Sequence, residues 1–214
     1  MKLLCFSDAH LAGQAPRALG QFIQSARPDL ALAVGDLTTR GPLSYAQELI
    51  AVVEEAGVRA LAVGGNMDPP EVHSWLSRKG ISIHCRRVEV GDFNIVGLGG
   101  SLTTPFGTPV EFTEGEIAGM LANAGIDSKT IFAPHNPPLG TCADLTAAGK
   151  HVGSKSILDA INKFQPALCV CGHIHEARGT QTLGKTKLVK LPPLLEGKAA
   201  LVDLPGMAVM ELSL

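Results

Sequence analysis

Short, continuous apolar runs alternate with helical patterns along most of the chain, and this alternation constrains the fold more than any other feature. Runs of strand length lie at residues 3–6, 30–34, 59–63, 130–134 and 167–171. Strands that are apolar at every position are typical of sheets with both faces covered. We therefore expect βα units in which helices pack on the sheets.

Helical patterns fill most of the segments between these runs. The first has apolar side chains at the i, i+3, i+4, i+7 spacing, at Leu19, Phe22, Ile23 and Ala26. Further helices are predicted at residues 46–53, 70–79, 113–124 and 156–164. Ser44 with Gln47, and Thr113 with Glu116, are candidate capping boxes at two of them.

The remaining short strands decide the fold class. Residues 88–90 and 93–98 resemble a hairpin, and short strands at residues 188–191, 199–204 and 207–212 follow near the end of the sequence. Eightfold alternation is missing, and 214 residues are few for a (β/α) barrel, which typically needs about 250. We predict a single α/β domain over residues 1–214, with two facing mixed β-sheets flanked by helices in four αββα layers.

Composition excludes several classes of protein. Apolar residues make up 45% of the chain and charged residues 18%, which excludes a disordered chain. Lys and Arg number 18 against 20 acidic residues, so we expect no polybasic surface for nucleic acid and no membrane binding. Lys185, Lys187 and Lys190 fit the solvated face of a hairpin. The five cysteines lack zinc-finger spacing, and no secretory pattern or run of about 18 apolar residues occurs, so we expect a cytoplasmic protein.

Polar clusters follow five of the apolar runs. They are Asp8-Ala9-His10, Gly35-Asp36, Gly65-Asn66-Met67-Asp68, His135 and Gly172-His173-Ile174-His175. The carboxyl ends of strands in an open α/β sheet face a shared crevice, so these clusters are expected to converge there. Carboxylate, amide and imidazole donors suit Mn, Fe, Zn, Co or Ni, and with two ions close together a carboxylate such as Asp36 could bridge them.

Each cluster also has a purely structural interpretation. Asp8 could be a turn or cap residue, and Asp68, which precedes two prolines, fits a helix N-cap better than a ligand. A lone His135 would usually be a satisfied, semi-buried histidine. His173 and His175 favour metal binding even alone, because side chains at i and i+2 of a strand end point to one side. We interpret two cysteines, Cys169 and Cys171, as core thiols outside the site. We interpret two further histidines, His73 and His84, as surface residues outside the site.

The order of these five clusters resembles the motif order of the calcineurin-like metallophosphoesterase family. The motifs are D-x-H, G-D, G-N-x-D, H and G-H-x-H, and they span residues 8–175. The resemblance implies two facing sheets with a dinuclear centre at the strand ends, and it assigns seven ligands. These are Asp8, His10 and His175 for one metal, Asn66, His135 and His173 for the other, and Asp36 between them. It further implies two divalent transition ions, with Mn²⁺ first and Fe, Zn, Ni or Co as alternatives.

Met67 departs from the family pattern. Many members have a histidine here, in G-N-H-D or G-N-H-E, and that histidine is thought to donate a proton to the leaving group, which a thioether cannot do. The compact prokaryotic members without this histidine are the most similar, and they imply hydrolysis of phosphodiesters by in-line attack of a metal-bridging hydroxide. Asn66 and His135 would hold metal and phosphate together. The expected partner is a small phosphoester, with a nucleotide as one candidate, and a homo-oligomer remains open.

Two other functions remain open. A phosphomonoesterase would need a substitute acid, for which His151 is the first candidate. His151 lies in the segment Lys150–Lys155, before a helix whose free N–H groups favour an anion. A non-catalytic, metal-binding scaffold is the second, because the retromer subunit with this fold also lacks the catalytic histidine. The complete ligand set favours an enzyme.

Overall fold

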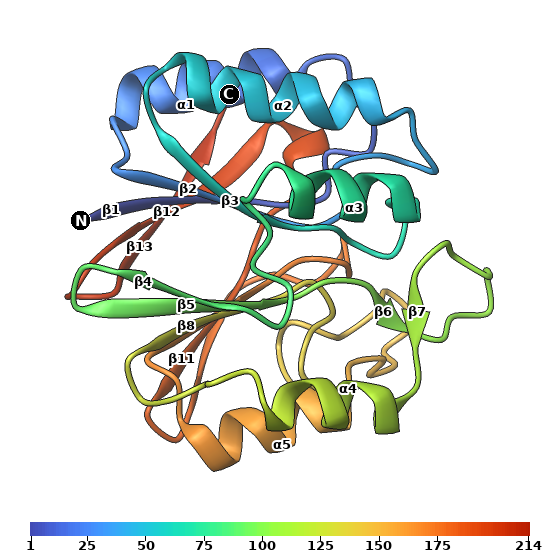
Figure 1. The fold of residues 1–214 in the computed structure, drawn as a ribbon. Helices are drawn as coiled ribbons and strands as arrows, with labels where there is room; N and C mark the ends of the chain where they lie inside the picture. Colours follow the sequence, from blue (N-terminus) through green and yellow to red (C-terminus); the bar gives the residue numbers. More distant parts are fainter.

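Two β-sheets packed face to face form the centre of the molecule, and helices cover their outer sides (Figure 1). The computed structural model describes residues 1–214. The first sheet contains, in hydrogen-bonding order, β13 (Ala208–Ser213), β12 (Lys198–Asp203), β1 (Lys2–Phe6), β2 (Leu30–Val34) and β3 (Arg59–Val63). The second contains β10 (Thr180–Leu183), β11 (Thr186–Lys190), β9 (Leu168–Cys171), β8 (Thr130–Pro134), β5 (Phe93–Leu98) and β4 (Arg87–Val90).

Both sheets are mixed. In the first, β1, β2 and β3 run parallel, and β12 and β13 add antiparallel strands at one edge. In the second, β5, β8, β9 and β11 run parallel, and β4 and β10 are antiparallel edge strands. The predicted fold class of two facing mixed sheets is confirmed, as is the hairpin of β4 and β5.

The helices form the two outer layers, and most of them are seen at the top and bottom of Figure 1. The first sheet is covered by α1 (Ala15–Ala26), α2 (Leu43–Glu55) and α3 (Pro70–Arg78), and the second by α4 (Glu114–Ala122) and α5 (Lys155–Phe164). A short 3-10 helix, η1 (Leu194–Glu196), precedes β12. None of the helices has the length and apolarity that crossing a membrane would require.

Alternation along the buried strands explains why their sequences are apolar at every position. On β1, Leu4 and Phe6 pack under the helices, whereas Leu3 and Cys5 pack between the sheets. On β9, Cys169 and Cys171 both face α4 and α5. Burial raises the pKa of the Cys171 thiol to about 12, so it is a protonated core side chain, as the sequence predicted.

One of the two predicted capping boxes is absent, and one small sheet was not predicted. The Thr113–Glu116 capping box is present. α2, however, begins after Pro42 without any side-chain cap, so the Ser44–Gln47 box is wrong. A small parallel ribbon of β6 (Ser101–Leu102) and β7 (Glu111–Phe112), which the sequence did not reveal, frames the loop between them.

Candidate metal centre

Loops at the carboxyl ends of five parallel strands bring the sequence motifs together. The loops follow β1, β2, β3, β8 and β9. Two groups of potential ligands form there, in each of which the ligand atoms lie within 4.8 Å of one another: Asp8, His10 and His175, and Asp36, His135 and His173. The predicted residues therefore converge on one place, although members such as His10 and His175 are 165 residues apart in the sequence.

Asp36 lies between the two groups. Its Oδ2 atom is 3.4 Å from Nε2 of His10 and 3.3 Å from Nε2 of His135. Its other oxygen, Oδ1, accepts a hydrogen bond from the Met67 N–H at 2.8 Å. One carboxylate oxygen thus faces both groups, while the second oxygen fixes the orientation of the carboxylate.

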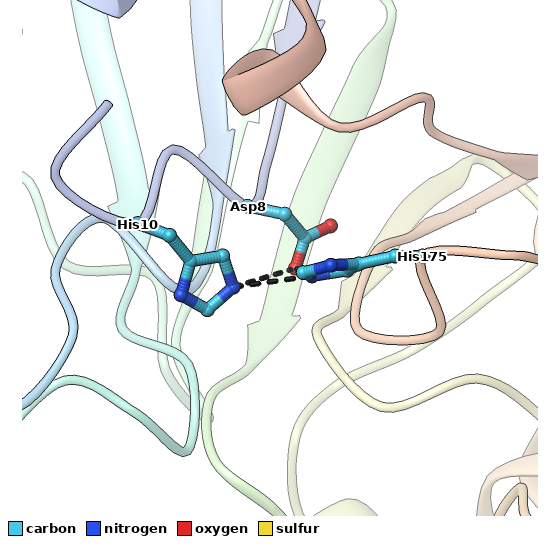
Figure 2. Close-up of side chains that lie close together, drawn as sticks. All are labelled: Asp8, His10 and His175. Carbon is cyan, nitrogen blue, oxygen red and sulfur yellow. Dashed lines mark hydrogen bonds and ion pairs between the residues drawn. The ribbon is translucent and has the colours of Figure 1, made fainter. Parts of the chain in front are cut away.

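The first group points its ligand atoms toward one another, as Figure 2 shows. Nε2 of His10 lies 3.1 Å from Nε2 of His175, which in turn lies 3.5 Å from Oδ1 of Asp8. The Asp8 carboxylate accepts hydrogen bonds from the Ser7 hydroxyl and from the His173 N–H. These bonds hold it in place before any ion binds.

The second group contains a contact that a cation would satisfy. The His135 Nδ1–H donates to the Val34 carbonyl at 2.8 Å, which leaves the lone pair on Nε2. In the neutral ring that Nε2 would face Oδ1 of Asn66, 3.1 Å away, as a second acceptor, unless a proton or a metal ion lies between them. Burial would lower the pKa of His135, but the charge and hydrogen bond of Asp36 raise it to about 9. The site therefore favours a positive charge at this point.

Cation binding needs neutral imidazoles and ionised carboxylates, so a bound ion would replace the proton of His135, whereas His173 and Asp8 already have the required states. Burial and the charge of His135 lower the pKa of His173 to about 4. Burial would raise the pKa of Asp8, but the His175 hydrogen bond and the charge of Lys190 hold it well below its usual range.

Backbone strain is concentrated in the same loops. Asp8, His10, Asp36 and His173 have φ values of 57°, 47°, 50° and 73°, in the left-handed region that non-glycine residues rarely adopt. Such conformations cost about 1–3 kcal/mol each and cluster at functional sites. Gly172 is needed for a different reason, because a Cβ there would lie 2.7 Å from Oδ2 of Asp8.

A hydrogen-bond relay that the sequence did not reveal orients Asn66. The Thr108 hydroxyl donates to Oε1 of Glu111 at 2.6 Å, so its lone pairs are free to accept the Asn66 amide N–H at 3.1 Å. With its NH₂ group engaged, the Asn66 amide turns its oxygen toward His135. The relay, which we call the Glu111–Thr108–Asn66 relay, fixes an amide orientation that metal binding would require.

Asp68 is a buried clamp, and its interpretation as a helix N-cap is wrong because Pro69 occupies that position. The Asp68 carboxylate accepts hydrogen bonds from the backbone N–H groups of Leu37, Thr38 and Gly65, and from the Thr38 hydroxyl. It therefore connects the loop of Asp36 with the loop of Asn66.

Three other expectations need correction. Lys190 is only 3% exposed and donates to the Leu191 carbonyl, so it is not on a solvated hairpin face. His73 and His84 are half-buried: His73 Nε2 contacts the Gly65 carbonyl, and His84 Nδ1 accepts the Gly99 N–H.

The predicted anion site before α5 is already filled by the protein. The Glu114 carboxylate accepts hydrogen bonds from the Lys155 and Ser156 N–H groups and from the Ser154 hydroxyl.

His151 is not brought to the ligand groups. Its Nδ1 pairs with Asp144 at 2.7 Å, its side chain is 46% exposed, and it does not line the adjoining cavity.

That cavity has a volume of about 850 Å³ and opens beside the ligand groups. Its lining contains His10, Asp36, Asn66, Met67, His173 and His175, together with the loop after β6. No Lys or Arg lines it, and Glu176 is its one acidic residue apart from Asp36. A phosphoester bound there would find cationic partners only at the ligand groups.

Comparison with known proteins agrees with this geometry. The profile of the calcineurin-like phosphoesterase family matches residues 1–177. The chain is 37% identical over 198 residues to an uncharacterized protein of Methanocaldococcus jannaschii, covering 90% of this chain and 88% of that protein.

Solved structures share the fold. The protein TT1561 of Thermus thermophilus superposes with a TM-score of 0.78 at 16% identity, covering 99% of this chain and 98% of the other. A dimetal phosphatase from Danio rerio superposes with a TM-score of 0.64 at 12% identity, covering 100% and 98%. With most of its length matched by the family profile, the chain belongs to the calcineurin-like phosphoesterases, a family of metal-dependent hydrolases.

Proposed function

We propose that the protein is a phosphodiesterase with two divalent metal ions, held by Asp8, His10 and His175 on one side and by Asn66, His135 and His173 on the other. The observation that carries this proposal is the position of Asp36, whose Oδ2 lies at nearly equal distances from His10 and His135. A carboxylate oxygen shared in this way suits a bridging ligand. The mixed oxygen and imidazole donors suit Mn²⁺ first, with Fe, Zn, Ni or Co as alternatives.

The residues of the chain have separate parts in this reaction. When bound, the two ions would polarise the phosphoryl oxygens and lower the pKa of water. Asn66 and His135 would hold the phosphoryl group in place, and the Glu111–Thr108–Asn66 relay keeps the amide oxygen of Asn66 pointing inward.

Two features of the cavity favour diesters over monoesters. Met67 lines the cavity where many family members have a proton-donating histidine, so good leaving groups are favoured. The cavity also lacks any Lys or Arg that could balance the second negative charge of a monoester. His151, the candidate acid of the monoesterase alternative, lies outside the cavity, which supports the diesterase over that alternative.

Metal removal and reconstitution test the proposal. Protein stripped with EDTA should be inactive, and reloading with Mn²⁺ should restore cleavage of bis(4-nitrophenyl) phosphate, followed as nitrophenolate release. 4-Nitrophenyl phosphate should react more slowly, because its dianion finds no extra cation in the cavity. Failure of Mn, Fe, Zn, Ni and Co alike to restore cleavage would favour the scaffold instead, and faster cleavage of the monoester would favour a monoesterase.

The relay predicts an effect of Thr108 on metal affinity. Thr108→Val keeps the side-chain shape and the backbone N–H to Glu111 but removes the acceptor of the Asn66 amide. Loss of an outer-shell partner typically costs 10- to 100-fold in metal affinity or activity. We therefore expect the Mn²⁺ concentration for half-maximal activity to rise by about tenfold or more.

Two further variants make this prediction specific. Thr108→Ser retains the hydroxyl and should restore Mn²⁺ activation, whereas Thr180→Val, on the exposed edge strand β10, should have no effect. Equal Mn²⁺ activation of Thr108→Val and the wild type would show that the relay does not position Asn66.

A further inference from the structure

Phe106 is the most exposed large apolar side chain of the protein, with 79% of its surface accessible, and it lies on the lining of the cavity. Val152, which is 40% exposed, lies on the same lining. Exposed apolar side chains gathered at a cavity are typical of ligand-binding sites. In this cavity they stand beside the candidate metal ligands.

The loop that carries Phe106 is held in place from several sides. Arg40 donates to the Gly107 carbonyl at 2.9 Å. Oε1 of Glu111 accepts hydrogen bonds from the Thr104 hydroxyl and from the Thr108 N–H. The Phe106 N–H in turn donates to the Thr104 hydroxyl oxygen at 3.2 Å. The exposed ring is therefore presented by a pre-organised loop, which reduces the entropy that binding a ligand would cost.

The surroundings of Phe106 specify the ligand chemistry. Leu102, Pro105 and Ile174 add apolar surface to the same cavity. No Lys or Arg is present to receive a second phosphate or a carboxylate, and Glu176 would repel one. These charges disfavour an anionic group beside Phe106, and a flat aromatic group gains most from packing on an exposed phenyl ring.

We propose that Phe106 and Val152 form a subsite for a flat, uncharged aromatic group on one ester of a phosphodiester that carries a single negative charge. The subsite rests on the proposed function, because the phosphoryl group must sit at the ligand groups for its ester to reach Phe106. It narrows the substrate class and makes Phe106 a specificity-determining residue.

Binding tests the subsite independently of catalysis. In titration calorimetry with Mn²⁺-loaded protein, Phe106→Ala should weaken the binding of diphenyl phosphate by about tenfold, the effect of losing one aromatic stacking partner. The binding of diethyl phosphate should change by less than about twofold. Phe106→Trp should restore diphenyl phosphate binding. Met210→Ala removes another exposed apolar side chain, 54% accessible and outside the cavity, and should have no effect.

Rates give the second measurement. Phenyl 4-nitrophenyl phosphate and methyl 4-nitrophenyl phosphate share a leaving group, so their intrinsic reactivities cancel when each variant is compared with the wild type. Phe106→Ala should lower kcat/KM about tenfold for the phenyl ester only. No loss for either ester would overturn the subsite while leaving the phosphodiesterase intact, whereas equal losses for both would support a subsite that takes the shared nitrophenyl group. Selective loss of diphenyl phosphate binding in a protein that cleaves neither ester would support the subsite and overturn the proposed activity.

Discussion

Asp36→Asn should abolish metal-dependent hydrolysis of bis(4-nitrophenyl) phosphate. Asparagine keeps the size of the side chain and an oxygen for the Met67 N–H, but it removes the negative charge that faces both ligand groups. Cations supply several kcal/mol of transition-state stabilisation, and each 1.36 kcal/mol is tenfold in rate, so kcat/KM should fall by at least about 10³-fold. Elemental analysis should show the metal content falling from about two ions per chain toward about one.

Asp92→Asn is the matched control, because Asp92 lies in the exposed turn between β4 and β5. It should keep full activity and full metal content. Circular dichroism and urea unfolding should show that both variants are folded, so that a loss of activity reports on the site alone. Near-normal rate and metal content in Asp36→Asn would remove this carboxylate from the centre.

The sequence predicted the convergence of the ligands because each one directly follows an apolar strand. Asp36 comes two residues after β2, and His173 comes two residues after β9. Parallel strands place such positions at one edge of a sheet, and the second sheet packs face to face with the first. Chain order and strand ends therefore predicted that the clusters converge, whereas the grouping of particular side chains around each metal came from the family resemblance.

The surrounding polar network could not be predicted, because its members are far apart in sequence. The carboxylate of Glu114, which lies 41 residues before Lys155, accepts hydrogen bonds from the N–H groups at the start of α5. Those N–H groups, which the local sequence left free for an external anion, therefore already have a partner. Lys190 is in a strand whose length and lysines resemble a surface hairpin, but β11 lies beside β9 inside the second sheet and its end is buried. In both cases the local sequence is typical of an exposed segment, and a partner far away in the sequence gives the residue a different role.

The role of Asp68 was also missed because two of its partners are distant in the sequence, although this residue joins two of the loops that carry metal ligands. An acid before two prolines, with Glu71 three residues later, is a typical start of a helix. Its actual partners are Leu37 and Thr38, about thirty residues earlier, and Gly65 in its own loop. Because one carboxylate joins both loops, the position of Asp36 relative to Asn66 depends on a residue that need not touch metal or substrate.

Asp68→Ala should therefore destabilise the whole fold. The substitution leaves three buried backbone N–H groups without an acceptor, and each costs about 1–3 kcal/mol, so the free energy of unfolding should fall by about 3–5 kcal/mol after partial relaxation. Urea unfolding measures this loss, and Asp92→Ala on the surface should change stability by less than about 0.5 kcal/mol. Asp68→Asn keeps one acceptor oxygen and should be intermediate. If Asp68→Ala unfolded at the urea concentration of the wild type, the clamp would contribute nothing, and the spacing of the two metal loops would have to be set by the strands alone.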